Sequence, residues 1–267
     1  MEHPLARAVA PQLEWRDSCP STNTDLVSRA ADLPDLAVLA TADQTAGRGR
    51  LDRVWSAPAG ASLAVSIFVR LDPAALDPQQ LGWLPLLAGV AMTRAVRELG
   101  VAGAGLKWPN DVLVHGRKLS GVLTELTPHG VVIGAGLNLT LREDQLPVPT
   151  ATSLALEGVA TTAAASDHDN AADAALTDRA LAAFLRETFD LVAQWRAAPT
   201  AAALRSLVEP VLATLGHAVR VDQPGLAPLR GVAEALDDDG RLLVRAAEPS
   251  SSLVAVSAGD VTHLRYE

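Results

Sequence analysis

The sequence predicts an α+β fold in which helices flank a mixed β-sheet and a small second β-structure follows. Three observations indicate this class: helical spacing of apolar residues over 79–99, closely spaced strand segments over 106–137, and a run of short strands after residue 215. Strand segments that follow one another directly are typical of antiparallel hairpins, whereas a doubly wound fold alternates strands with helices. We therefore expect antiparallel hairpins in the sheet.

The segment before residue 79 is expected to hold one helix and two strands. Thr22 or Asn23 can cap the helix, because either side chain can accept a hydrogen bond from the first backbone N–H groups, and Pro34 marks its end. A continuous apolar run over 37–41 indicates a buried strand. Alternation of apolar residues over 62–70 indicates a longer one.

Strand signals dominate the part of the chain that follows the long helix. The expected strands cover 106–108, 112–114, 118–126 and 131–137. Residues 158–175 are Ala-rich and lack strong apolar periodicity, which indicates a variable loop or weak helix without chemistry. Helical spacing returns over 178–195, and Thr177 or Asp178 is the expected cap.

The pattern of the sequence changes again near residue 213, from helical spacing to short strand segments. Short strands are expected at 218–221, 229–236, 241–246 and 252–256. The turn Asp237-Asp238-Asp239-Gly240 between two of them predicts a hairpin. We divide the chain accordingly into a larger domain over 1–212 and a smaller one over 213–267.

Composition limits the classes of protein that fit. The chain has 267 residues, 49% of them hydrophobic and 20% charged, which is typical of a globular protein with a large core. A formal net charge of −9 argues against nucleic acid as the main partner. Cys19 is the single cysteine, so no internal disulfide forms, and no apolar run is long enough for a membrane span. We expect a cytoplasmic protein that does not associate with membranes.

A loop rich in glycine and arginine is the first candidate for a ligand site. It runs from Gly47 through Arg48, Gly49 and Arg50 to Arg53, so backbone amides and guanidinium groups can converge on phosphate or carboxylate oxygens. Taken alone, such a loop could equally be a solvated surface segment or a nucleic-acid-binding tail. Two further strings at the ends of strand segments favour the anion site: Lys107-Trp108-Pro109-Asn110-Asp111 and Gly134-Ala135-Gly136-Leu137-Asn138.

Together with Ser21-Thr22-Asn23, Gln44-Thr45-Ala46 and Lys118-Leu119-Ser120-Gly121, these strings resemble, in content and order, the biotin protein ligases, which attach biotin to a lysine of a carboxylase carrier domain. The resemblance extends from about Ser21 to the C-terminus. It implies a mixed sheet like that of class II aminoacyl-tRNA synthetase catalytic domains, followed by a small C-terminal β-barrel. The lead-in of about 20 residues is too short for the DNA-binding domain that some of these ligases carry, so we expect the short form without repressor function.

The resemblance also implies the chemistry. ATP activates biotin as biotinyl-5′-AMP, and Arg48, Arg50 and Lys107 are the expected catalytic residues, because cations in a dry site offset the repulsion between a carboxylate and a phosphate. Lys107 is expected between the biotin carboxylate and the α-phosphate. A solvated lysine at a strand end is the alternative interpretation.

The remaining site residues are also carried over from the resemblance. The expected biotin-binding residues are Ser21, Thr22, Asn23, Gln44, Gly47, Arg48, Gly49, Arg50, Lys107, Gly134 and Gly136. The expected ATP-binding residues are Arg48, Arg50, Arg53, Lys107, Asn110 and Asn138. The alternatives are ordinary structural roles: a helix cap for the Ser-Thr-Asn string, a bulge for the glycines, and hydrogen-bonded turns for the asparagines.

Partners follow from the same resemblance. ATP and biotin are the expected substrates, Mg²⁺ accompanies ATP, and the acceptor is the biotin carboxyl carrier domain of acetyl-CoA or acyl-CoA carboxylase. No His/Cys/Asp spacing resembles a zinc site, so no dedicated metal centre is expected. The expected oligomeric state is a monomer or a homodimer.

One residue departs from the family pattern. The loop is implied to close over bound biotin and its adenylate, and the family usually has glycine where this chain has Asp52. An aspartate tolerates left-handed backbone, but its charge beside a phosphate site is not explained. Two other functions remain open: a lipoate or octanoate ligase or transferase of similar fold, and a non-catalytic biotin or nucleotide sensor.

Overall fold

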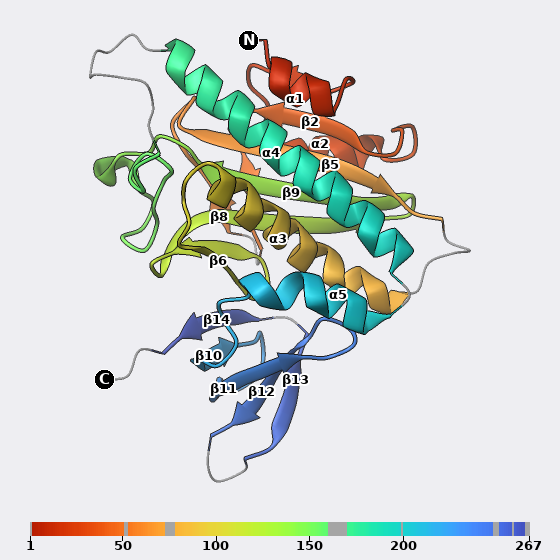
Figure 1. Ribbon diagram of the computed structural model, residues 1–267, viewed down its shortest axis with the longest axis vertical. Helices are drawn as coiled ribbons and strands as arrows, with labels where there is room; N and C mark the ends of the chain where they lie inside the picture. Colours follow the sequence, from red (N-terminus) through yellow and green to blue (C-terminus); the bar gives the residue numbers. More distant parts are fainter. Residues whose placement is uncertain are drawn as a thin grey trace.

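A seven-stranded mixed sheet forms the centre of the molecule, in the strand order β1-β2-β5-β9-β8-β7-β6 (Figure 1). The computed structural model describes residues 2–50, 53–72, 78–159, 170–198, 200–247, 251–257 and 259–264. The strands are β1 (Glu14–Arg16), β2 (Ala37–Thr41), β5 (Ser62–Arg70), β6 (Ala104–Lys107), β7 (Asp111–Val114), β8 (Arg117–Thr127) and β9 (Gly130–Asn138). Among these seven strands only β1 and β2 pair in parallel, so the expectation of a mixed sheet with antiparallel hairpins is confirmed.

The two faces of the sheet have different coverings. Helices α3 (Trp83–Glu98) and α4 (Asn170–Ala197) cross one face, and α2 (Thr22–Arg29) packs on the other (Figure 1). Because side chains alternate along a strand, Ile67 and Val69 join the core under α3 and α4, whereas Phe68 joins the small cluster under α2. The same alternation aims every second residue of β5 and β9 at the α2 side of the sheet.

The N-terminal lead-in is part of this domain. It folds as α1 (Pro4–Val9) followed by β1, which adds an edge strand to the sheet. Both carboxylate oxygens of Asp178 accept hydrogen bonds from the backbone, one from Leu5 and one from Ala6. Asp178 thus ties α4 to the first turn of α1.

Two predicted helix caps are wrong. The hydroxyl of Ser21 caps α2 by accepting from the backbone of Thr24 at 3.3 Å, while Thr22 and Asn23 lie inside the helix. Helix α4 starts at Asn170, well before the expected cap at Thr177 or Asp178. The Ala-rich stretch is therefore helical from 170 onward, and its residues 160–169 lie outside the described part of the chain.

The C-terminal part is a five-stranded antiparallel sheet with the order β13-β12-β11-β10-β14. Its strands are β10 (Ala218–Asp222), β11 (Leu229–Leu236), β12 (Leu242–Ala246), β13 (Leu253–Val256) and β14 (Asp260–His263). The first four were predicted; β14 was missed because it carries a single apolar residue flanked by polar ones. In the described residues β13 and β14 stand at opposite edges and do not pair, so the expected small C-terminal β-structure is present but does not close into a barrel.

The predicted hairpin turn at Asp237–Gly240 is confirmed, and it joins the two parts of the molecule. The indole N–H of Trp83 donates to the carbonyl of Asp238 at 3.0 Å, and that of Trp108 donates to the carbonyl of Gly240 at 3.1 Å. Trp108 is therefore a core residue. One hydrophobic core runs through both parts, and the boundary between 212 and 213 stays a prediction. Helix α5 (Ala201–Val208) precedes the C-terminal sheet.

Candidate active site

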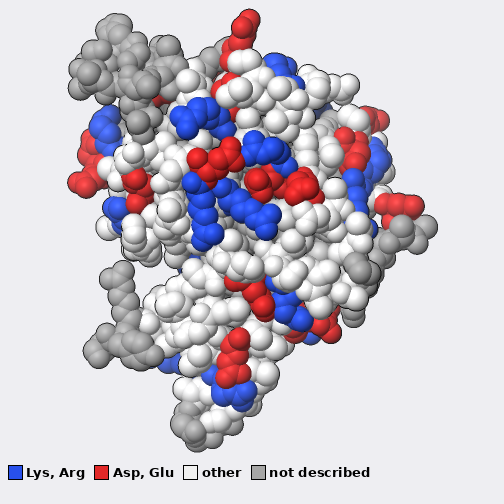
Figure 2. All heavy atoms as spheres, in the orientation of Figure 1, with Lys and Arg blue, Asp and Glu red and all other residues white. Residues whose placement is uncertain are grey.

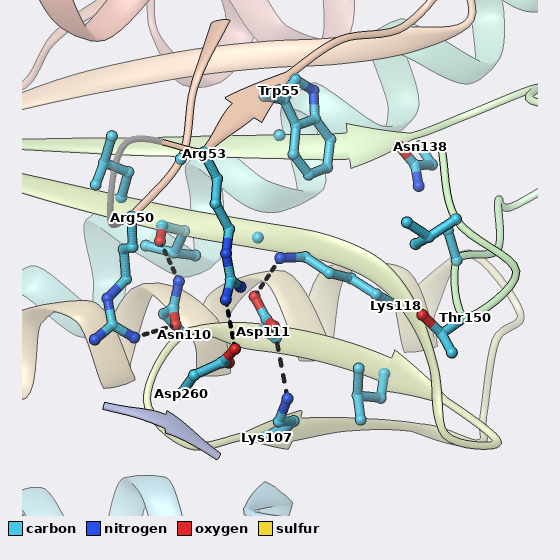
Figure 3. A pocket seen from close by; sticks show the side chains of 18 of the residues that line it. Arg50, Arg53, Trp55, Lys107, Asn110, Asp111, Lys118, Asn138, Thr150 and Asp260 are labelled. Carbon is cyan, nitrogen blue, oxygen red and sulfur yellow. Dashed lines mark hydrogen bonds and ion pairs between the residues drawn. The ribbon is translucent and has the colours of Figure 1, made fainter. Parts of the chain in front are cut away.

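A cavity of about 1510 Å³ lies on the face of the main sheet opposite α3 and α4. A two-stranded ribbon, β3 (Gly47–Arg48) with β4 (Val54–Trp55), covers one side, and the C-terminal sheet contributes residues from another (Figure 3). Almost all predicted site residues line it: Ser21, Thr22, Asn23, Gln44, Arg48, Gly49, Arg50, Arg53, Lys107, Asn110, Gly134, Gly136 and Asn138. The exception is Gly47, which does not line the cavity.

Hydroxyl and amide groups form a buried network at one end of the cavity. Ser66 Oγ lies 2.7 Å from Thr22 Oγ1 and 2.6 Å from Asn23 Oδ1. The Gln44 side-chain oxygen accepts from the Thr22 backbone at 2.9 Å. Asn23 Nδ2 donates to Glu125 at 2.9 Å. This end of the cavity thus offers both donors and acceptors to a polar ligand group.

The glycines of this region make room for other side chains of the protein. A methyl group at Gly134 would stand 2.0 Å from Asn23 Oδ1, and one at Gly136 would stand 2.5 Å from the Trp55 ring. A methyl group at Gly47 would meet the Trp55 carbonyl at 2.3 Å and the Gln44 amide at 2.4 Å. These positions require glycine because Asn23, Gln44 and Trp55 approach the backbone so closely.

Each arginine of the loop has a partner that the sequence did not reveal. Arg48 pairs with Glu125 at 3.0 Å, on β8. Arg50 donates to the side chain of Asn110 at 2.8 Å, and burial lowers its pKa. The Arg53 guanidinium pairs with Asp260 of β14 at 2.5 Å (Figure 3).

Two lysines flank one carboxylate in the middle of the cavity. Lys118 Nζ lies 2.6 Å from Asp111 Oδ1, and Lys107 Nζ lies 4.0 Å from Oδ2 of the same residue (Figure 3). Burial lowers the pKa of Lys107, and the carboxylates of Asp111 and Asp260 oppose that shift. Lys107 is thus a largely buried cation, with a side chain that is 17% exposed, and the solvated alternative does not fit.

Sequence reasoning missed several residues of the cavity. Asp111 and Lys118 belong to two of the sequence strings that resemble the family, Lys107–Asp111 and Lys118–Gly121. Their charges in those strings are the signal from which a role in the site could have been assigned. Asp260 and His263 belong to a strand that carried no signal. Burial lowers the pKa of His263 to about 4, and Lys107 nearby acts in the same direction.

Metal ligands are sparse in the described part of the chain, where no group of three or more His, Cys, Asp or Glu side chains could hold a metal ion. Asn110 has its amide oxygen bound by Arg50, and Asn138 donates its amide N–H to the Thr152 carbonyl at 2.8 Å. The Asp111 carboxylate is a hard oxygen donor that lies between Lys107 and Lys118. Among the described residues, no helix is long and apolar enough to cross a bilayer.

Comparison with known proteins decides the family. Residues 15–138 match the model of the biotin/lipoate A/B protein ligase family, and residues 214–264 match the biotin protein ligase C-terminal domain. The chain is 42% identical over 254 residues to the biotin–[acetyl-CoA-carboxylase] ligase of Mycobacterium tuberculosis, covering 92% of this chain and 86% of that protein. The chain belongs to the biotin protein ligase family.

Other members of the family are similar to this chain over most of their length. The biotin–[acetyl-CoA-carboxylase] ligase of Paracoccus denitrificans is 32% identical over 240 residues, covering 84% of this chain and 90% of that protein. The structure of the Aquifex aeolicus biotin protein ligase in complex with biotin and ATP superposes with a TM-score of 0.73 at 25% identity, covering 96% of this chain and 99% of that one. The α+β fold and the ligase class expected from the sequence are thereby confirmed.

Proposed function

We propose that this protein is an ATP-dependent ligase that activates biotin as biotinyl-5′-AMP and transfers it to a lysine of a biotin carboxyl carrier domain. One observation carries the proposal: a single cavity joins the buried hydroxyl and amide network around Thr22 and Asn23 to a cluster of cations that includes Arg50 and Lys107. The network suits a neutral polar ring such as the biotin ureido group. The cations suit a carboxylate and phosphates.

In the first step, a biotin carboxylate oxygen attacks the α-phosphorus of ATP, and the bond to the β-phosphate oxygen breaks with release of pyrophosphate. Both reactants are anions, so their approach needs fixed positive charge. Lys107 supplies such a charge in a desolvated position, where its interaction with developing negative charge is stronger than in water. Arg48, Arg50 and Arg53 add guanidinium groups from the ribbon side.

In the second step, the amine of the acceptor lysine attacks the acyl carbon of biotinyl-AMP. The amide bond forms, AMP leaves with the bonding electron pair, and the amine loses a proton. The mixed anhydride hydrolyses readily, so a cover that keeps water out favours transfer. Arg50 contacts both Asn110 and the carbonyl of Gly259, and it thereby ties the ribbon to the opposite walls of the cavity.

Mg²⁺ is proposed as part of the ATP substrate. It needs few protein oxygens, because phosphates and water complete its coordination. Asp111 offers a carboxylate from β7, one oxygen of which pairs with Lys118, whereas Arg50 occupies the Asn110 oxygen. When bound, Mg²⁺ would supply further charge neutralisation of the phosphates.

The acceptor is proposed to be the carrier domain of acetyl-CoA or acyl-CoA carboxylase, and the protein is proposed to act in the cytoplasm as a monomer or homodimer. Nucleic acid is not proposed as a partner. The surface over α3 and α4 carries interspersed basic and acidic side chains, including the pairs Arg94–Glu187 and Arg186–Glu98 (Figure 2). A nucleic-acid-binding face normally concentrates basic residues instead.

Competition between labelled biotin and lipoate tests the substrate, and pyrophosphate release with biotin and ATP alone tests the reaction. We expect tight binding of biotin, no displacement by lipoate, and release of pyrophosphate. Preference for lipoate would identify a lipoate or octanoate ligase. Binding of biotin without pyrophosphate release would identify a sensor.

A further inference from the structure

Asp260 brings a negative charge from the C-terminal sheet into the cation cluster of the cavity. It is the first residue of β14, and its Oδ2 lies 2.5 Å from Arg53 Nη2. The preceding residue, Gly259, accepts a hydrogen bond from Arg50 at 3.4 Å through its carbonyl. Two arginines of the loop after β3 are thus held by adjacent residues that lie more than 200 positions further along the chain (Figure 3).

The surroundings keep this carboxylate ionised. Burial raises the pKa of Asp260, but the hydrogen bond from Arg53 and the charges of Arg53, Lys107 and Arg50 outweigh that effect, so the net pKa is lowered. Asp260 also favours the charged form of Lys107 in return. It therefore neutralises part of the positive potential that the triphosphate of ATP would meet.

Arg53 in turn fixes the ribbon. Its carbonyl accepts from the backbone of Gly49 at 2.7 Å, and its N–H donates to the carbonyl of Arg50 at 3.2 Å. The next residue, Val54, is the cross-strand partner of Arg48. A side chain that holds Arg53 thus also restrains Arg48 and Arg50 on the cavity.

We propose that Asp260 is an exchangeable partner of Arg53. It holds the ribbon on the C-terminal sheet until a triphosphate takes Arg53 over, and it recaptures Arg53 once pyrophosphate has left. Asp260 is a positioning residue in this scheme, because it acts through Arg53 rather than on the reacting atoms. The scheme rests on the proposed function for the nature of the triphosphate ligand.

The scheme predicts two effects of Asp260→Asn that a general loss of structure would not combine. The KM for ATP falls by about threefold at low salt, because one competing negative charge is removed, and the effect shrinks at high salt. Release of pre-formed biotinyl-AMP accelerates by about threefold, because the ribbon has lost the partly exposed ion pair between Arg53 and Asp260. ATP thus binds more tightly to the variant, whereas biotinyl-AMP is retained less well.

Asp222 provides the matched control. It lies directly opposite Asp260 in the β10–β14 pairing, and its carboxylate is bound by Arg220 of its own strand at 2.8 Å. Asp222→Asn removes the same charge from the same sheet without touching Arg53. We expect its KM for ATP and its release rate to match those of the wild type.

A third measurement needs neither substrate. In the absence of biotin and ATP, trypsin should cleave the Arg53–Val54 bond faster in Asp260→Asn than in the wild type or in Asp222→Asn, because Arg53 is no longer held. If wild-type protein forms no biotinyl-AMP, the proposed function fails, and the trypsin comparison still decides whether Asp260 restrains Arg53.

The exchange scheme requires both kinetic shifts in Asp260→Asn and neither in Asp222→Asn. A raised KM for ATP, either shift without the other, or values within about twofold of wild type would overturn it. If Asp260→Asn does not fold, Arg53→Gln replaces it. That variant must release biotinyl-AMP faster but show a raised KM for ATP, and any other pattern overturns the scheme.

Discussion

Lys107 shows how a residue acquires chemistry from its surroundings. A lysine on the surface is a hydrated charge with little effect on a reaction, whereas Lys107 ends strand β6 inside the cavity with most of its side chain buried. Burial lowers its pKa, and the nearby carboxylates of Asp111 and Asp260 keep the charge available. The result is a cation with few water molecules to displace when an anion arrives.

Lys107→Ala should therefore reduce biotinyl-AMP formation by about a hundredfold or more, since one donor to developing charge is worth about 2.7–4 kcal/mol. Single-turnover measurement of pyrophosphate release by the folded variant checks this. Lys118→Ala is the informative comparison, because Lys118 pairs with the same carboxylate. Near-normal rates in Lys107→Ala with a large loss in Lys118→Ala would transfer the role to Lys118.

Arg50 is expected to retain the intermediate rather than make it. Arg50→Gly removes the contacts to Asn110 and Gly259 while leaving Lys107 in place, so biotinyl-AMP should still form but escape faster. Escaped anhydride acylates exposed lysines at random. Serum albumin added to the reaction should consequently gain more biotin with this variant than with wild type.

The Arg48→Ala variant separates the two roles. It should mainly slow adenylation, because the change removes a positive charge from the cavity and frees Glu125, which also accepts from Asn23 in the network proposed for biotin. If Arg50→Gly makes adenylate but labels albumin no more than wild type does, the loop does not retain the intermediate. The family's covering loop would then not apply to this chain, in which Asp52 replaces the usual glycine and lies outside the described residues.

At the scale of elements, the longer strands were predictable and the helix ends were not. Apolar alternation located β5, because every second residue of this strand joins the core under α3 and α4. The first turn of α4 had no such marker, and its predicted cap, Asp178, instead binds the backbone of α1. A carboxylate can satisfy any nearby N–H groups, and only the fold decides which ones those are.

Strand β9 must carry glycine where α2 crosses it. Gly134→Ala should destabilise the protein and weaken biotin binding, by about 1–3 kcal/mol, because the new methyl group displaces the Asn23 side chain. Calorimetric titration with biotin and a denaturant melt measure both effects. Gly103→Ala is the control, since the nearest atom to its methyl group would be the end of the His115 side chain at 3.3 Å. Equal behaviour of the two variants would contradict this account of the glycine.

Strand β14 carries a histidine that should make stability depend on pH. Burial lowers the pKa of His263 to about 4, below its ordinary value of 6.5, so between these values the unfolded chain binds a proton that the folded chain does not. This contribution to stability is present above pH 6.5 and is lost as the pH falls toward 4.

His263→Gln should remove that dependence. The ring is partly exposed, which reduces the effect. Between about pH 7 and pH 4.5, the free energy of unfolding should fall by about 1–2 kcal/mol more in the wild type than in the variant. Urea melts at several pH values measure the difference. Parallel stability curves for the two proteins would show that His263 titrates alike in the folded and unfolded states.

On the scale of the whole molecule, the strings that carry the site were predictable because they mark strand ends. The ends of β6 and β9 and the ribbon after β2 meet on one face of one sheet, so motifs as far apart as Ser21 and Asn138 fall into one cavity. Ser66 and Glu125 escaped prediction because a strand gives no sign of which of its polar residues will bind a side chain such as Asn23. Asp260 escaped because its partner Arg53 is 207 positions away.

The C-terminal sheet is therefore part of the site and not an appendage. It shares the hydrophobic core with the main sheet through the turn at Asp237–Gly240, and it supplies Asp260 and His263 to the cavity. Biotin, ATP and the acceptor lysine must all be handled in that one space. The account of the molecule as a ligase thus depends on transfer to a carrier and not only on activation.

Intact-mass analysis of a biotin carboxyl carrier domain, incubated with the full chain, biotin, Mg²⁺ and ATP, tests this most directly. The account predicts a gain of one biotinyl group on one lysine, dependent on ATP and lost when that lysine of the carrier is replaced by arginine. No gain in mass, or an equal gain on the carrier that lacks its target lysine, would contradict it.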